Sequence, residues 1–306
     1  MSETNLSSLL GHLPVSQQTV AIHNPTNGKK IYDLPQLSSD AVANTVADAR
    51  AAQKFWSAVS PAERAQVLLR THDLLMKNQD RLIELLQLET GKAKSHAFEE
   101  IAGAYGAARY FGKISAKALK PNRTKAGVPV LTKTWVEHSP MGVVGVITPW
   151  NYPLALTMLD VLPALAAGNA VVQKADNQTA LTVLFARHLA VEAGIQESAW
   201  TVVVGNGAEV GNAITDHADY VAFTGSTATG RLVAERAAKR LIGYSLELGG
   251  KNPMIVLEGA NLKRAADLAL AGAFGSAGQL CVSLERVYVP NHLKDEFTAE
   301  LAARTH

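Results

Sequence analysis

Hydrophobic residues recur with a helical period over most of the first 120 residues of this chain. A hairpin is predicted first, because Asn27-Gly28 is a tight-turn pair between two strand-like runs at 20–24 and 29–34. The helical segments that follow are bounded by capping signals such as the Ser60-Pro61-Ala62-Glu63 box and Gly91. The predicted helices run from Ser39 or Asp40 to about 58, from 61 through 75, from 80 to 91, and from 93 to about 119.

From residue 141 the pattern changes to short apolar runs separated by helix-length segments. Buried apolar strands that alternate with helices are typical of a parallel, doubly wound α/β sheet. Residues 121–140, which are polar, indicate an excursion hairpin outside the core. The predicted strands lie at 143–147, 170–172, 201–204, 220–223, 254–257 and 286–289, and the predicted helices at 154–167, 181–193 and 208–215.

The composition of the 306-residue chain, with 47% hydrophobic and 18% charged residues, is that of a soluble globular protein of about two domains. A net charge of +2 gives no electrostatic reason to expect nucleic acid or an anionic membrane as a partner. No apolar run approaches the roughly 18–20 residues that span a bilayer, and residues 1–18 lack the pattern of a signal peptide. The single cysteine excludes an internal disulfide and fits a reducing compartment, so we predict a cytoplasmic protein.

Three polar residues, each expected in a loop bounded by Gly or Pro, have the chemistry of a covalent acyl-transfer site. The lone thiol, Cys281, has a polar approach in Gly278-Gln279 that favours an activated nucleophile; an inert buried thiol is the alternative. Glu247 lies among apolar residues and suits a general base, or it is a salt-bridged structural glutamate. Asn151 can donate to a developing oxyanion, or it is an ordinary turn asparagine beside proline.

Two further segments fit a phosphate-bearing cofactor. Gly225-Ser226 follows a predicted strand and opens a helix whose free N–H groups suit a phosphate; an ordinary strand-to-helix turn is the alternative. Lys174 follows another strand, at the edge where open parallel sheets bind ligands, or it is a solvated surface lysine. Asn177 either faces the same ligand or caps a helix. The sequence shows neither metal-ligand spacing nor a serine nucleophile elbow.

Together these segments resemble the NAD(P)-dependent aldehyde dehydrogenase family, with matching order and spacing from about residue 20 to the last residue. The segments that carry the resemblance are Ile147-Thr148-Pro149-Trp150-Asn151-Tyr152-Pro153, Lys174, Gly225-Ser226-Thr227, Leu246-Glu247-Leu248-Gly249-Gly250-Lys251 and Gly278-Gln279-Leu280-Cys281. The resemblance implies an aldehyde dehydrogenase-like α/β fold with a doubly wound parallel dinucleotide-binding domain at 1–246 and an oligomerisation hairpin at 119–140. It also implies that 247–306 is the N-terminal, incomplete part of an α/β catalytic domain, and that the protein is a homo-oligomer, a dimer or tetramer.

In the mechanism that the resemblance implies, Cys281 attacks the carbon of a small aldehyde while the Asn151 amide and the Cys281 backbone N–H stabilise the oxyanion. Hydride leaves to nicotinamide, giving a thioester, and Glu247 activates the water that releases the acid. NADP is predicted to be preferred over NAD, because Asn177 stands where NAD-preferring relatives have a glutamate that repels a 2′-phosphate. The implied cofactor-binding residues are Thr148, Pro149, Trp150, Lys174, Asn177, Gly225, Ser226 and Leu248.

Within the family, residues 245–289 are most similar to the succinate-semialdehyde dehydrogenases, which makes succinate semialdehyde the expected substrate. Leu159 and Gly275 stand where mitochondrial-type members have carboxylate-binding arginines, and Asp160 where many relatives have a lysine. Another cation must then bind the carboxylate, or the substrate differs. Family members are longer, so the chain is expected to be truncated, inactive as it stands and prone to associate. The alternative is a non-catalytic remnant that at best binds a dinucleotide.

Overall fold

The computed structural model describes residues 8–13, 16–128 and 130–305. The chain divides into two compact units, Met1–Leu246 and Glu247–His306. None of the helices in the described parts of the chain combines the length and the apolar character needed to cross a membrane.

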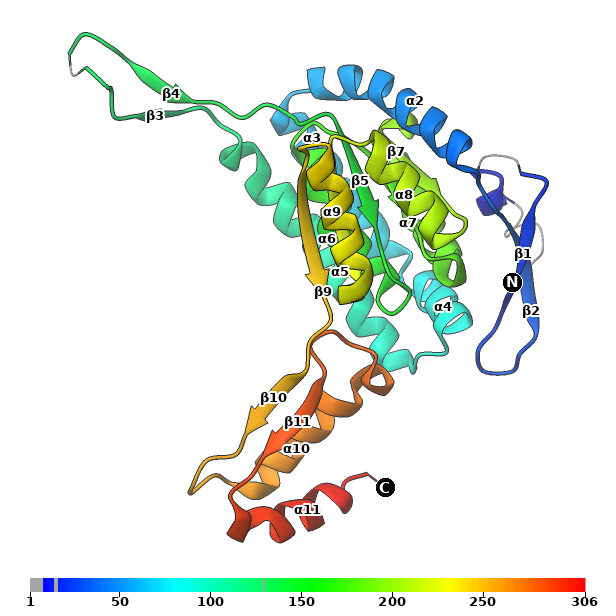
Figure 1. Ribbon diagram of the computed structural model, residues 1–306, viewed down its shortest axis with the longest axis vertical. Helices are drawn as coiled ribbons and strands as arrows, with labels where there is room; N and C mark the ends of the chain where they lie inside the picture. Colours follow the sequence, from blue (N-terminus) through cyan, green and yellow to red (C-terminus); the bar gives the residue numbers. More distant parts are fainter. Residues whose placement is uncertain (1–7, 14–15, 129, 306) are drawn as a thin grey trace. The chain divides into compact units, whose positions relative to one another are not determined.

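A five-stranded sheet in the order β7-β6-β5-β8-β9 forms the centre of the first unit (Figure 1). The strands β7, β6, β5 and β8 pair in parallel, and the order reverses at β5, with β6 and β7 on one side and β8 and β9 on the other. This confirms the predicted doubly wound α/β sheet. The strands are β5 (Val143–Ile147), β6 (Ala170–Lys174), β7 (Trp200–Val203), β8 (Tyr220–Gly225) and β9 (Gly243–Leu248).

Helices cover both faces of this sheet. On one side α6 and α7 pack against α3, α4 and α5, and on the other side α2 and α8 pack together and α8 meets α9. The central strands β5 and β6 are buried along their whole length, which explains the uninterrupted apolar sequence of β5 and the apolar start Ala170-Val171-Val172 of β6. The helices are α2 (Ser39–Ala58), α3 (Pro61–Lys77), α4 (Gln79–Thr90), α5 (Lys94–Ala118), α6 (Pro153–Ala166), α7 (Ala180–Glu192), α8 (Gly207–His217) and α9 (Thr227–Lys239).

Local signals account for most of the element ends. Ser60 and Glu63 form the predicted capping box at the start of α3, and Gly91 ends α4 in the left-handed conformation, with φ 71°. The predicted cap of α2 is wrong by one or two residues, because Ser38 accepts the hydrogen bond from Ala41 N–H. The capping position belongs to Ser38, whose hydroxyl reaches a free amide of the first turn, and not to Ser39, the first residue of the helix.

Two hairpins lie outside the main sheet. Strands β1 (Thr19–His23) and β2 (Lys30–Pro35) pair antiparallel across the predicted turn. Strands β3 (Asn122–Thr124) and β4 (Thr134–Val136) also pair antiparallel, and all of their residues are exposed. The second pair lies within the segment 119–140 that was predicted to leave the core.

The edge strand β9 was not predicted, and it changes the placement of Glu247. This residue lies inside β9 and is exposed, so the expectations of a loop and of an apolar environment are wrong. An edge strand lacks the continuous apolar run of a central strand, because only part of its surface is covered.

The second unit contains a parallel strand pair and two helices. Strand β10 (Asn252–Ile255) pairs with β11 (Leu284–Tyr288), and α10 (Leu262–Phe274) and α11 (Lys294–Ala302) accompany them. Its small core holds Val256, Leu262, Ala265, Ala266, Ala269 and Phe297.

Candidate functional site

A cavity of about 440 Å³ lies in the first unit, at the carboxyl ends of β5, β6 and β8 and at the amino ends of α8 and α9. Strand order reverses here, and open parallel sheets bind ligands at such points. Six of the predicted cofactor residues line the cavity: Thr148, Pro149, Trp150, Lys174, Gly225 and Ser226.

Lys174 supplies a cation that this unit leaves without a partner. The residue is 6% exposed and lines the cavity, and among the described residues its Nζ makes no hydrogen bond or ion pair. Burial lowers the pKa of Lys174, and the nearby charge of Asp176 opposes that shift. The side chain is largely buried, lines the cavity and has no hydrogen-bond or ion-pair partner for its ammonium among the described residues, so the surroundings favour an anionic or hydroxyl-bearing ligand beside it.

Two helix amino ends face the same cavity. Ser226 is the N-cap of α9, where its Oγ accepts from Thr229 N–H at 3.2 Å. Gly207, at the start of α8, also lines the cavity. A side chain at Gly225 would meet the Phe223 ring at 2.7 Å, so this position favours glycine. Helix amino ends carry free N–H groups and positive dipole ends, which suit a pyrophosphate. With Lys174, the residues present fit a nicotinamide dinucleotide.

Two of the predicted cofactor residues do not line this cavity. Asn177 uses both ends of its amide elsewhere: Oδ1 accepts from Gly205 N–H at 3.0 Å, and Nδ2 donates to Gln36 Oε1 at 3.3 Å. It is not a helix cap either, because Asp176 caps the short 3₁₀ helix η1 (Asn177–Thr179) and also lines the cavity. Leu248 lies in β9 and is not among the residues that line the cavity.

Asn151 lies in the loop between β5 and α6. The loop is held at its start by Thr148, whose N–H donates to Lys174 O at 3.1 Å and whose Oγ1 accepts from Gln173 Nε2 at 3.0 Å. Asn151 is half-buried, and its neighbour Trp150 is 45% exposed and lines the cavity. Asn151 therefore lies, along the chain, between a residue of the cavity wall and the first turn of α6.

Cys281 lies in a turn of the second unit, between the 3₁₀ helix η3 (Gly275–Gly278) and β11. The thiol is free and exposed, which contradicts the alternative of an inert buried cysteine. Asn252 Nδ2 donates to Cys281 O at 2.6 Å and to Ser283 O at 3.0 Å, so β10 holds the cysteine turn. The sequence analysis missed Asn252; the signal was a polar residue that opens a strand directly after the Gly249-Gly250-Lys251 segment.

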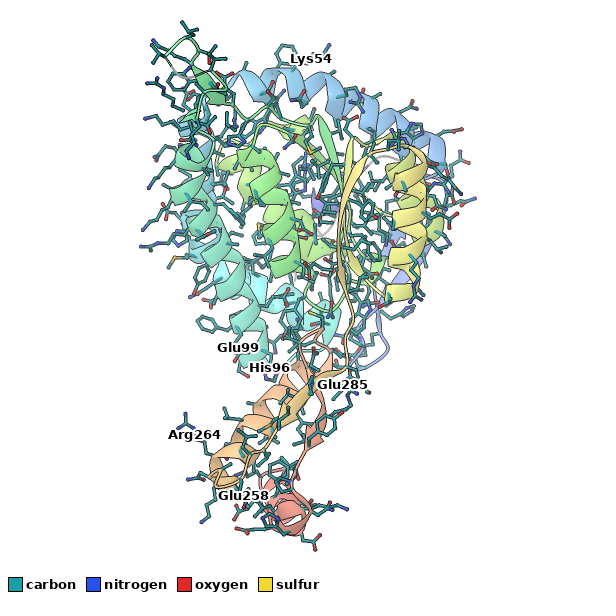
Figure 2. All side chains as sticks on the ribbon, turned by 60° about the vertical axis from the view of Figure 1, so that its left-hand side comes forward. Lys54, His96, Glu99, Glu258, Arg264 and Glu285 are labelled. Carbon is teal, nitrogen blue, oxygen red and sulfur yellow. The ribbon has the colours of Figure 1, made fainter. Side chains whose placement is uncertain are left out.

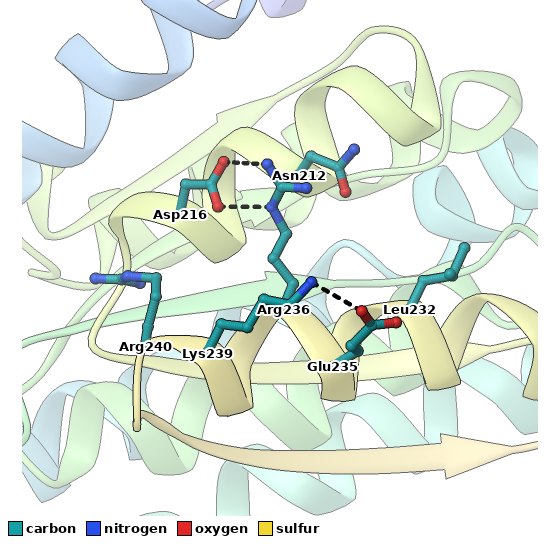
Figure 3. Close-up of a pocket in the computed structure, with 7 residues that line it drawn as sticks. All are labelled: Asn212, Asp216, Leu232, Glu235, Arg236, Lys239 and Arg240. Atoms are coloured by element: carbon teal, nitrogen blue, oxygen red, sulfur yellow. Dashed lines mark hydrogen bonds and ion pairs between the residues drawn. The ribbon is translucent and has the colours of Figure 1, made fainter.

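A second cavity, of about 460 Å³, lies between α8 and α9 (Figure 3). Its charges pair with one another: Arg236 binds both oxygens of Asp216 at 2.6 and 2.5 Å, and Lys239 Nζ donates to Glu235 at 2.8 Å. Arg240 donates to the carbonyls of Thr215 and Ala218, both at 2.6 Å. No cation is left over for a ligand among these residues, which favours the first cavity as the cofactor site. Within the described residues, His, Cys, Asp and Glu form no cluster that could hold a metal ion.

The chain is similar to known proteins along most of its length. Residues 13–306 match the model of the aldehyde dehydrogenase family. A Mycolicibacterium smegmatis protein named "Putative succinate-semialdehyde dehydrogenase (NADP(+))" is 48% identical over 93% of this chain and 55% of its own length. A Mycobacterium ulcerans protein with the same name and the suffix 2 is 46% identical over 92% of this chain and 55% of its own length. The chain thus spans about half the length of these relatives.

Solved structures show the same fold. An Escherichia coli protein described as an NADP dependent enzyme has a TM-score of 0.90 and 35% identity, over 94% of this chain and 60% of that chain. Betaine aldehyde dehydrogenase from Staphylococcus aureus in complex with NAD+ has a TM-score of 0.91 and 31% identity, over 97% of this chain and 62% of that chain. These matches confirm the predicted fold class.

Proposed function

Because the chain belongs to the aldehyde dehydrogenase family, we propose that it carries the cofactor-binding and nucleophile-bearing part of an enzyme that oxidises a small aldehyde to the acid. The observation that carries this proposal is the first cavity, where the partnerless cation of Lys174 and the amino ends of α8 and α9 converge. This combination of one buried cation and two phosphate-compatible helix ends matches the charges of a dinucleotide.

The cavity residues divide the binding of the dinucleotide between them. Lys174 holds the adenosine ribose, Ser226 and the first turn of α9 hold the pyrophosphate, and Trp150 packs near the phosphates. When bound, the dinucleotide supplies the hydride acceptor of the reaction. Every residue that lines the cavity lies in the first unit, so we expect this unit to contact the cofactor.

The chemistry of the aldehyde falls to three side chains. The Cys281 thiolate attacks the carbonyl carbon, and the Asn151 amide donates a hydrogen bond to the oxyanion. Glu247 accepts a proton from the water that cleaves the thioester, which releases the acid and restores the thiol. The exposure of Cys281 and of Glu247 supports these roles, because both groups must meet substrate or water.

We further propose succinate semialdehyde as the aldehyde, NADP as the preferred cofactor, a homo-oligomer as the assembly and the cytoplasm as the location. The names of the relatives support the first two. Asn177 no longer carries the cofactor choice, because its amide is used by Gly205 and Gln36. The carboxylate that the cavity does contain is Asp176, so its charge opposes a 2′-phosphate while Lys174 attracts one.

Calorimetric titration of the 306-residue chain with NADP and NAD tests the cofactor proposal. We expect both to bind, NADP with the lower Kd, and Asp176→Asn to increase that preference. The variant Asn177→Glu tests the assignment of cofactor choice to Asn177. It should lower the free energy of unfolding and leave the ratio of the Kd values for NADP and NAD unchanged. Tighter binding of NAD by the natural chain would refute the NADP proposal, and no binding of either would refute the dinucleotide site.

Assays with NADP and either succinate semialdehyde or butanal, an uncharged aldehyde of the same chain length, test the reaction and the substrate. A second candidate function is dinucleotide binding without turnover, which the confinement of the cavity to the first unit favours. NADP binding with no acid formed from either aldehyde would support this second candidate over the first.

A further inference from the structure

A buried ion pair lies directly behind the Asn151 loop. Lys92 follows the end of α4, and Glu100 lies near the start of α5; their side chains are 2% and 0% exposed, and Lys92 Nζ donates to Glu100 Oε2. Burying two charges is costly unless each has further partners. Both side chains find those partners at the same place, the start of α6.

Glu100 supplies the cap that α6 lacks. The N-cap residue of α6, Tyr152, makes no capping hydrogen bond with its side chain, and Pro153 has no N–H. The other oxygen of Glu100, Oε1, accepts from Leu154 N–H at 2.8 Å and from Ala155 N–H at 3.4 Å. A carboxylate from another helix thus meets the free amides and the positive dipole end of α6.

Lys92 reaches the same loop from the other side. Its Nζ stands over the Tyr152 ring, 3.6 Å from the ring centroid, while it also binds Glu100. One ammonium therefore contacts the residue directly after Asn151 and the carboxylate that caps the helix two residues later.

The loop is thereby fixed at both ends. Thr148 is bound to the end of β6, and the segment from Tyr152 to Ala155 is bound to Lys92 and Glu100. Only Pro149, Trp150 and Asn151 lie between the two anchors. A shift of the second anchor must move these residues, because so short a segment cannot absorb it.

Building on the proposed role of Asn151 in the reaction, we infer that Lys92 and Glu100 are positioning residues, whose buried pair sets the place of the Asn151 amide through the amino end of α6. Neither residue touches the reacting atoms in this assignment. Their effect on the reaction passes through Tyr152 and the backbone of the loop.

The variant Glu100→Gln in the 306-residue chain tests this inference by NMR. We expect amide hydrogen exchange at Leu154 and Ala155 to become about five- to tenfold faster, because the neutral glutamine oxygen accepts more weakly than a carboxylate and no longer complements the positive end of α6. The side-chain amide signal of Asn151 should also move from its natural position, which a merely structural cap would leave unchanged. Faster exchange with an unmoved Asn151 signal would overturn the inference, as would exchange within about twofold of the natural chain.

A matched control comes from the opposite end of the same helix. Arg64 is 4% exposed, and its Nε donates to Ala166 O, the last carbonyl of α6, at 2.9 Å. Arg64→Met should therefore destabilise the unit without moving the Asn151 signal. An equal shift of that signal in Arg64→Met would also overturn the inference, because general loosening of α6 would then explain both.

A further variant covers the case in which Glu100→Gln does not fold. The pair Lys92→Met with Glu100→Gln leaves no unpaired buried charge and should fold, with the same change at Asn151. Natural dinucleotide binding by this double variant, with an unmoved Asn151 signal, would overturn the inference. The NMR readouts need no cofactor, so a natural chain that fails to bind NADP refutes the proposed function and leaves the positioning test intact.

Discussion

Removal of the cavity's cation by Lys174→Met is the most direct test of the cofactor site. Methionine is unbranched and apolar, so it fills the space of the lysine stem without its charge. Lys174 is 6% exposed and makes no hydrogen bond or ion pair through its ammonium among the described residues, so the substitution breaks neither kind of interaction within the first unit. Any loss of binding then comes from contact with the ligand.

The expected magnitude follows from burial. A hydrogen bond with one charged partner contributes about 1.5–3 kcal/mol, so we expect Kd for NADP to rise about 10- to 150-fold. The free energy of unfolding, in contrast, should stay the same or rise. Burial lowers the pKa of Lys174, which means that the folded state disfavours its charge. Below the usual lysine pKa of 10.5, the Met variant should be as stable as the natural chain or more stable.

Calorimetric titration with NADP at physiological salt, together with a thermal melt of each protein, measures both changes. Lys54→Met is the control, because Lys54 is exposed on the outer surface of α2 (Figure 2). It removes one positive charge from the chain without touching the cavity. The reasoning is refuted if Lys174→Met binds NADP within about twofold of the natural chain, or if binding and stability fall together.

Three further predictions concern other parts of the chain. Cys281→Ala should remove the single cysteine of the 306-residue chain from a titration with a thiol reagent. In a full-length form of the enzyme this variant should lose aldehyde oxidation, whereas Glu247→Gln should give one burst of reduced cofactor and then stall; steady turnover by either variant would contradict the covalent mechanism. Burial raises the pKa of Glu89 from 4.5 to about 7. Its contribution to the free energy of unfolding is therefore complete below pH 4.5 and is lost as the pH rises through 7. The change amounts to about 3 kcal/mol. Urea unfolding from pH 4 to 8 should show this slope as the difference between the natural chain and Glu89→Gln, and parallel profiles would argue against it. Gly145→Ala should lower the free energy of unfolding by about 1–3 kcal/mol in the same assay, because the new Cβ would meet Ile214 Cγ2 at 2.2 Å. Gly106→Ala, which has open space around it, should not destabilise α5. Equal effects of the two variants would show that packing against Ile214 is not the cause.

Short-range signals explain where the sequence analysis was accurate. The capping box of Ser60 and Glu63 and the left-handed Gly91 depend on residues within one helical turn, so their effect is legible without the fold. The buried strand β5 is a continuous apolar run and β6 begins with one, a pattern that a half-exposed strand does not need. The cap of α2 was misplaced because the hydroxyls of neighbouring serines compete for one amide. The strand β9 was not predicted because an edge strand has a weak hydrophobic pattern.

The cofactor site shows the same division between local and long-range signals. The positions of Lys174 and Ser226 after buried strands are visible in the sequence, and both residues line the cavity. The choice between Asp176 and Asn177 is not visible, because it depends on where the Asn177 amide finds partners. Those partners are Gln36, 141 positions away, and Gly205, 28 positions away.

The sequence by itself determined the family, the order of the strands and helices apart from β9, and the candidate nucleophile, because these depend on residue type and on spacing along the chain. Only the tertiary structure decided which polar groups are left without partners and which pair. Lys174 faces a cavity without a partner, whereas Lys92 is bound to Glu100 beneath the Asn151 loop. Lys174 ends β6 and Lys92 lies two residues after α4, so both are lysines at the end of a regular element and no local pattern separates them. The physical reason is that the free energy of a buried charge depends on groups brought to it from distant parts of the chain.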